Sequence, residues 1–147
     1  MKKIYRSSKI FFFFQDRGLA LSHRSLLKSF IEQLFIDENK KPRQINYIFC
    51  DNSYMLKLNL HYLNHNYFTD ILTFPLEERN GAISADIFIN IDEVRKNAKE
   101  YGNSLREEIH RVIFHGALHL CGYKDKTDKE KRLMRKKEDH YLSLYLK

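Results

Sequence analysis

Two histidines, His115 and His119, stand four residues apart in a segment that is otherwise apolar from Phe114 to Leu120. On a helix this spacing places both imidazoles on one face, with about 5–6 Å between their Cβ atoms. Two neutral imidazoles at that separation can bind one tetrahedral metal ion, as the histidine pair of zinc proteases does. The alternative is a half-buried pair that only hydrogen-bonds to backbone, so the spacing by itself leaves metal binding open.

Two glycines near these histidines favour a metal site. Gly116 lies between them, and because glycine in a helix interior costs about 1 kcal/mol relative to alanine, it suggests the close approach of another backbone. Gly122 ends the helix, so that Asp125 can turn back toward the histidines. Asp125 can then supply an oxygen ligand and leave the fourth position to water, as in catalytic zinc sites. The alternative is a carboxylate that only flanks the next helix.

The elements that must position these residues follow from hydrophobic periodicity and capping residues. Strands are predicted at 9–15, 44–50, 71–74 and 84–90, and helices at 22–37, 55–63, 91–101, 104–120 and from 127 onward. The four consecutive phenylalanines from Phe11 to Phe14 indicate a buried strand. Ser22 is the predicted cap of the first helix, and Ser104 and Thr127 open capping boxes. Because strands and helices do not strictly alternate, we expect a single α+β domain over 1–147, with a mixed four-stranded sheet, about five helices and a central, zinc-metalloprotease-like histidine helix.

Composition excludes several classes of protein. The chain has 147 residues and a formal net charge of +7, and its longest apolar run, Ile10 to Phe14, is far below the roughly 20 residues of a membrane span. That run is also too short for a signal peptide. Cys50 and Cys121 are isolated, so we expect a cytoplasmic protein with reduced thiols and assign Cys121 to packing. The basic surplus favours a polyanionic partner without specifying one.

The segment HGALHLCGYKD, His115 to Asp125, resembles the signature of the YbeY family of bacterial rRNA-maturation endoribonucleases, H-G-x-L-H-L-x-G-Y-D-H, whose three histidines bind the metal. Upstream, TDILTFP at 69–75 is similar to the family's T-D-V-L-S-F-P strand, and ADIFI at 85–89 is similar to its G-D-I-x-I strand. The segments occur in the family's order and spacing over about residues 58–140.

The chain departs from this pattern at four positions. Asp125 replaces the third histidine and Lys124 the aspartate before it, while Asn103 stands where the family has G-H-S. The resemblance therefore implies His115, His119 and Asp125 as metal ligands, because carboxylate is a competent zinc ligand. Leu63 replaces the arginine of the family's Y-R dipeptide and, having neither donor nor charge, cannot bind phosphate. Nearby His61 and His65 are alternatives for that task, or surface residues.

The resemblance implies a zinc-dependent endoribonuclease with about one Zn²⁺ per chain. The implied enzyme acts on single-stranded RNA, in 16S rRNA maturation and in ribosome quality control. The small ribosomal subunit and its assembly factors are the implied partners. Metal would polarise the scissile phosphate or activate its water. Two alternatives remain: a ribosome-associated RNA-binding factor with weak or no nuclease activity, and a metal-dependent hydrolase of another substrate class. A peptidase is disfavoured because Gly116 occupies the place of the zinc proteases' catalytic glutamate.

Thr69, Asp70 and Lys124 are the predicted substrate-binding residues, and no general base is evident. Asp70, and Asp86 in the next strand, are the polar candidates for that role, and structural hydrogen bonding is the alternative for both. Basic residues follow the histidine motif and either face the cleft or form a solvated helix face; they are Lys124, Lys126, Lys129, Lys131, Arg132, Arg135, Lys136 and Lys137.

Overall fold

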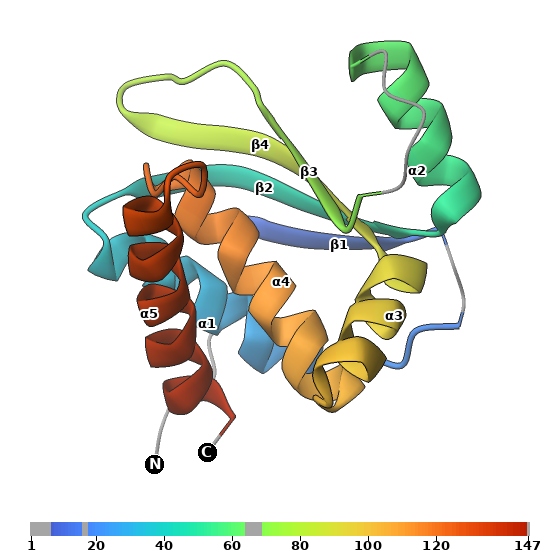
Figure 1. Ribbon diagram of the computed structural model, residues 1–147. Helices are drawn as coiled ribbons and strands as arrows, with labels where there is room; N and C mark the ends of the chain where they lie inside the picture. Colours follow the sequence, from blue (N-terminus) through green and yellow to red (C-terminus); the bar gives the residue numbers. More distant parts are fainter. Residues whose placement is uncertain (1–6, 16–17, 64–68, 147) are drawn as a thin grey trace.

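Four strands form one mixed sheet in the computed structural model, which describes residues 7–15, 18–63 and 69–146 (Figure 1). The strands are β1 (Ile10–Phe14), β2 (Lys41–Cys50), β3 (Ile71–Pro75) and β4 (Ala82–Asn90), in the spatial order β1-β2-β4-β3. β1, β2 and β4 are parallel, whereas β3 is antiparallel to β4. The parallel strands therefore all begin at one end of the sheet, and β3 ends there.

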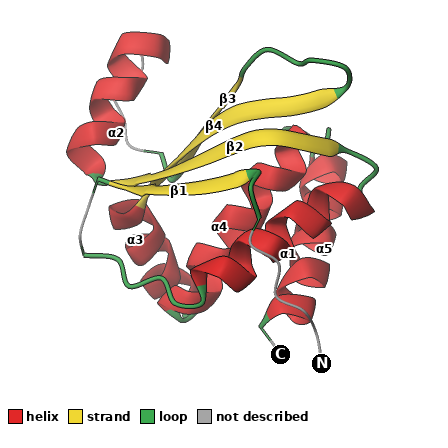
Figure 2. Cartoon of the chain, turned by 180° about the vertical axis from the view of Figure 1, so that it is seen from behind, coloured by secondary structure: helices red, strands yellow, loops and turns green. Residues whose placement is uncertain are grey.

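Four helices cover one face of this sheet (Figures 1 and 2). They are α1 (Arg24–Asp37), α3 (Ile91–Tyr101), α4 (Leu105–Leu120) and α5 (Asp128–Tyr145). The fifth helix, α2 (Asn52–Leu58), continues into the π-helical turn η1 (Asn59–Leu63) and lies at one end of the sheet. This arrangement confirms the predicted α+β fold. Within the described residues, no helix is both long enough and apolar enough to cross a membrane.

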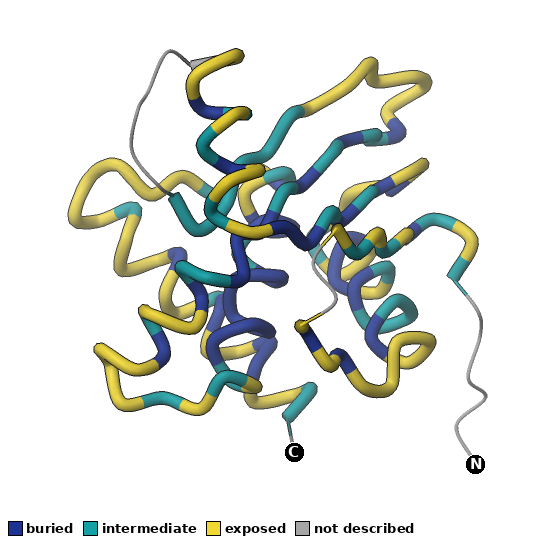
Figure 3. Tube along the Cα trace, turned by 90° about the vertical axis from the view of Figure 1, so that its right-hand side faces the viewer, coloured by how far each residue is buried: buried dark blue, intermediate teal, exposed yellow. Residues whose placement is uncertain are grey.

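The core lies between the sheet and α4, and Figure 3 shows the buried positions gathered in the middle of the molecule. Inward residues of β2 and β4, such as Tyr47 and Ile87, meet Ile113 and Phe114 of α4, and all four are fully buried. The Tyr47 hydroxyl donates to the Ile113 carbonyl at 2.9 Å, so its polar end is satisfied. The predicted central position of the histidine helix is thus confirmed.

The prediction of a buried first strand is wrong. β1 is an edge strand that pairs only with β2, and its side chains alternate between the core and the open face of the sheet. Phe12 contacts Tyr47 and Phe49, but Phe11 and Phe13 remain 37% and 49% exposed. A run of identical apolar residues carries no alternation, so it cannot indicate which side of a strand faces solvent.

The cap residues explain where the functional helix and its neighbour begin. Ser104 Oγ accepts a hydrogen bond from Glu107 N–H at the start of α4, and a complete capping box between Thr127 and Glu130 starts α5. The predicted cap Ser22 is wrong, because α1 begins one residue later, after His23 in a left-handed conformation with no side-chain cap.

Gly116 lies where α4 crosses β3 and β4. A Cβ atom at this position would be 2.9 Å from Ile71 Cδ1 and 3.2 Å from Ile87 Cγ2. The close approach inferred from the sequence is therefore real, but it is to side chains of the sheet and not to another backbone. Because Gly116 has no Cβ, the histidine helix can pack close to β3 and β4.

Candidate metal centre

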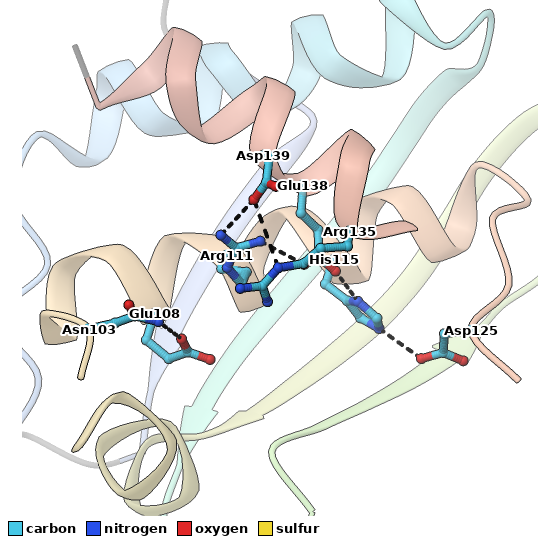
Figure 4. Close-up of polar contacts among 8 residues, drawn as sticks. All are labelled: Asn103, Glu108, Arg111, His115, Asp125, Arg135, Glu138 and Asp139. Atoms are coloured by element: carbon cyan, nitrogen blue, oxygen red, sulfur yellow. Dashed lines mark hydrogen bonds and ion pairs between the residues drawn. The ribbon is translucent and has the colours of Figure 1, made fainter. Parts of the chain in front are cut away.

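His115 is held by a carboxylate from the last helix (Figure 4). Its Nδ1 lies 2.6 Å from Glu138 Oε2, and Arg111 donates to the other oxygen, Oε1, at 3.1 Å. The Arg111 and Glu138 side chains are only 9% and 8% exposed. An ionised carboxylate only accepts hydrogen bonds, so Nδ1 carries the ring proton and the lone pair of Nε2 is left to bind a metal.

The same contacts set the ionisation of His115. Burial opposes its positive charge, but the hydrogen bond to Glu138 and the nearby Asp125 and Asp70 carboxylates outweigh burial and raise the pKa of His115 above its usual value. The negative surroundings that stabilise a proton on Nε2 also favour a metal cation at the same place.

Asp125 lies opposite the free nitrogen of His115, as Figure 4 shows. Gly122, with a φ of +108°, follows α4 and reverses the chain, and Asp125 Oδ2 then stands 3.3 Å from His115 Nε2. Two ligands of a tetrahedral zinc ion, with bonds of about 2.0–2.1 Å, are about 3.3–3.4 Å apart. The separation is long for a hydrogen bond but fits a pair of ligand atoms that share a metal.

His119 is on the next turn of α4, where its side chain is exposed. It lines a pocket of about 250 Å³ together with Lys40, Pro75, Leu76, Glu78, Ile83, Ser84 and Leu120. In the ranges that the structure describes, no group of three or more His, Cys, Asp or Glu is already arranged to hold a metal. The structure thus brings two of the predicted ligands together, and the third is an exposed side chain one helical turn away.

Thr69 and Asp70 lie directly before β3, beside this centre. Burial raises the pKa of the Asp70 carboxyl, against the attraction of His115, so the two groups are within electrostatic reach of each other. Thr69 Oγ1 is buried and has no hydrogen-bond partner among the described residues. A buried hydroxyl without a partner is costly, which makes this atom a candidate donor to a bound group.

The other predicted site residues are spread more widely. Lys124 is exposed and lines a different pocket, of about 690 Å³, with Glu38, Lys40 and Lys137. Asp86 accepts a hydrogen bond from Asn46 at 2.9 Å, which is its structural role. His61 is exposed and stacks edge-on with Tyr62. The Leu63 side chain and His65 lie outside the part of the chain whose side chains are described.

The basic residues after the motif form a solvated face. Lys124, Lys126, Lys129, Lys131, Arg132, Arg135 and Lys136 are all exposed, and the partly buried Lys137 binds Glu38. Leu133 and Leu144 of α5 are about half exposed as well. Cys121 is buried as predicted, and burial together with the Glu38 charge raises the pKa of its thiol to about 12, which keeps it protonated.

Glu138 and Arg111 were not predicted as site residues. The signal for Glu138 is its spacing: it lies four residues after Met134 and three before Tyr141, and all three are buried on one face of α5. A carboxylate at an inward position needs a buried cation or hydrogen-bond donor. Arg111 and His115, four residues apart on α4, supply both.

Known proteins resemble this chain over most of its length. The family model described as "Endoribonuclease YbeY" matches residues 14–145. A protein of that name from Cytophaga hutchinsonii is 45% identical over 139 residues, covering 95% of this chain and 97% of its own. One from Flavobacterium johnsoniae is 41% identical over 130 residues, covering 88% and 93%. The solution structure of a Thermotoga maritima protein, 29% identical, superposes with a TM-score of 0.64 over 90% of this chain and 86% of that one.

Proposed function

The chain belongs to the YbeY family of endoribonucleases, and from that premise we propose that it is a zinc-dependent endoribonuclease of single-stranded RNA. We further propose that it acts in the cytoplasm, in the maturation of 16S rRNA and in ribosome quality control, with the small ribosomal subunit and its assembly factors as partners. The relatives' names support cleavage of RNA. The metal, the strand and the cellular setting are the parts that need testing.

One observation carries the catalytic part of the proposal. His115 has its Nδ1 proton held by Glu138 at 2.6 Å and its Nε2 facing Asp125 at 3.3 Å. Carboxylate–histidine pairs of this kind orient ligands in zinc proteins. His115, Asp125 and, after rotation of its exposed side chain, His119 would hold the ion. A bound zinc supplies Lewis acidity to the phosphate and an activated water.

The remaining residues of the centre have roles that their positions allow. Glu138 and Arg111 keep the His115 ring fixed, so its Nε2 is ready before substrate binds. Asp70, whose raised pKa leaves it able to carry a proton at a higher pH than an exposed aspartate, is a candidate to exchange a proton with the attacking water or the leaving group. Thr69 Oγ1 and Lys124 would bind phosphate oxygens.

Metal content and RNA cleavage test this proposal together. Tag-free wild type should contain about one zinc per chain by mass spectrometry and should cleave a single-stranded RNA. Asp125→Ala should lose most of both. Asp128→Ala, an exposed residue three positions later at the start of α5, is the matched control and should keep both. Equal zinc in the two variants would remove Asp125 from the ligand set.

A second candidate function rests on two substitutions. Asp125 stands in place of the third histidine and Leu63 in place of the arginine of the family pattern. The first substitution alters the proposed metal ligands, and the second removes a cation that could bind phosphate. An RNA-binding factor with weak or no nuclease activity would bind RNA without zinc-dependent cleavage. This function would appear as a wild type that contains no zinc and cleaves nothing in that experiment, yet binds the same RNA tightly in a separate titration.

A further inference from the structure

A further pocket opens at the end of the sheet where the parallel strands begin. It has a volume of about 380 Å³ and is lined by Lys9, Lys41, Pro42, Arg43, Arg79, Asn80 and Ala82. Four of these seven residues are cations and none is acidic. In Figure 1 this end of β2 and β4 lies at the left, on the same side as the C-terminal end of α4.

The cations of this basic pocket are little neutralised. Among the described residues, Arg79 has one acidic partner, Glu77 at 3.5 Å, and both side chains are more than half exposed. Exposed pairs of this kind contribute little because water screens them. Lys41 and Arg43 are exposed and carry no ion pair in the described part of the chain. The pocket therefore presents a positive field to solvent.

A β-bulge in β2 places two of the cations. Pro42 pairs with Ile83 and Gln44 pairs with Ser84, so Arg43 is the extra residue on this strand. Without the bulge, the alternation that puts Ile45 inward would also put Arg43 inward. With it, the buried Pro42 takes the inward place next to Ile83, and both Lys41 and Arg43 remain exposed at the pocket.

Two neighbouring segments bring the other cations to the same place. Asn80 and Gly81 both have positive φ, 53° and 76°, as a type I′ turn requires. This turn closes a pair of backbone hydrogen bonds between Arg79 and Ala82, whose strand partner is Lys41. On the other side, the Ile45 N–H donates to the Lys9 carbonyl at 2.8 Å. Three separate segments thus converge on one pocket.

The basic pocket is aligned with the candidate metal centre along β4. Gly116 of the histidine helix packs on Ile87, His119 lines a pocket with Ser84 and Ile83, and Ala82 belongs to the basic pocket. From Ile87 to Ala82 is about 17 Å at 3.3–3.4 Å per residue. One extended nucleic-acid strand can span that distance from the metal centre to the basic pocket.

We infer that the basic pocket is a second phosphate-binding subsite, which holds the backbone of the same RNA strand several nucleotides from the bond to be cleaved. The inference rests on the proposed function for the identity of the strand. It assigns Lys41, Arg43 and Arg79 to substrate binding, and it makes affinity depend on strand length. A strand too short to extend past the metal centre gains nothing from these cations.

Binding of strands of two lengths tests the inference. Strands of about 4 and about 16 nucleotides, the range of site sizes in single-strand-binding domains, are titrated at several salt concentrations by fluorescence anisotropy. For the long strand, Lys41→Gln/Arg43→Gln should flatten the slope of log affinity against log salt by about 1.4, since each single-strand phosphate contact contributes about 0.7. Arg79→Gln, on another segment, should flatten it by about 0.7. Binding of the short strand should not change.

The control removes the same charge elsewhere. Lys96→Gln/Lys99→Gln alters two exposed lysines of α3, which follows β4 at the opposite end of the sheet, and should leave the long-strand slope at the wild-type value. Equal losses in the two double variants, or equal losses for short and long strands, would overturn the subsite. Product gels of the same samples separate the two proposals: a wild type that cleaves no RNA contradicts the nuclease, whereas a length-dependent loss in the variants still supports the subsite.

Discussion

His115 can bind a metal ion through Nε2 only if its ring is held in the right orientation, and Glu138 provides that orientation. One oxygen of the Glu138 carboxylate accepts a hydrogen bond from His115 Nδ1–H, and the other accepts one from Arg111. Arg111 and Glu138 are both nearly buried, so removing either one leaves the charge of the other without compensation. The candidate centre therefore depends on a residue that binds neither metal nor RNA.

Glu138→Gln should weaken zinc binding about 10–100-fold, as loss of partners behind metal-bound histidines does in other proteins. A chelator competition measures the affinity, and nitrogen NMR of His115 should show the Nδ1–H tautomer becoming less populated. Glu138→Asp, which keeps a carboxylate, should restore part of the affinity.

Asp139→Asn is the matched control for that substitution. Asp139 binds the same Arg111, at 2.8 Å, but does not contact His115. The zinc affinity of the Asp139→Asn variant and the tautomer of its His115 should stay at wild-type values. If both variants lose zinc affinity equally, Glu138 acts by holding Arg111 in place and not by orienting the His115 ring.

At the scale of the elements, α4 must approach the sheet closely for His115 to lie within electrostatic reach of Asp70, which directly precedes β3. Gly116→Ala places a Cβ 2.9 Å from Ile71 Cδ1, and overpacking of this kind costs about 1–3 kcal/mol, partly offset by the better helix propensity of alanine. We expect a net loss of about 1 kcal/mol in the free energy of unfolding, measured with urea.

Ile71→Val tests whether that contact is the cause. It removes the atom that the new Cβ would meet, so the double variant should be less destabilised than the sum of the two single variants by at least about 0.5 kcal/mol. Strict additivity would show that the helix shifts as a whole and does not press on Ile71.

The elements differ in how far the sequence predicts them. α4 and α5 were predictable because Ser104 and Thr127 cap them and their apolar spacing is regular. The proximity of Asp125 to His115 was also predictable, since α4 ends one turn after His115 and the chain reverses at Gly122. Glu138 was not, because its partner is on another helix, and the edge position of β1 depends on strand pairing that four identical phenylalanines do not encode.

At the scale of the whole molecule, Glu38 connects three distant parts of the chain. Its carboxylate follows α1, accepts a hydrogen bond from Tyr123 in the turn before Asp125, and binds Tyr141 and Lys137 of α5. Burial opposes its ionisation, but the hydrogen bonds from Tyr123 and Tyr141 and the Lys137 charge outweigh burial and hold the pKa of Glu38 below its ordinary value.

Glu38→Gln should lower the free energy of unfolding by about 2–3 kcal/mol near pH 7, because hydrogen bonds to a charged acceptor are lost. A carboxyl group whose pKa is lowered by folding contributes its full stabilisation of the folded state when the pH is above its pKa in the unfolded chain, 4.5. That contribution is lost as the pH falls toward the pKa in the folded protein. The difference from wild type should therefore shrink below about pH 4.5 in urea titrations.

Asp37→Asn, an exposed neighbour bonded to Gln33, is the control and should change stability by less than about 0.5 kcal/mol at either pH. A difference between Glu38→Gln and wild type that stays constant into acid would contradict the ionised state assigned to Glu38.

The order of the chain gives the Glu138 contact a consequence during synthesis. Glu138 follows His115 by 23 residues, and translation proceeds from the N-terminus. A nascent chain that has exposed both histidines and Asp125 still lacks the carboxylate that fixes the His115 tautomer. A protein proposed to cut RNA at the ribosome thus acquires an oriented metal ligand only after α5 has been made and has docked.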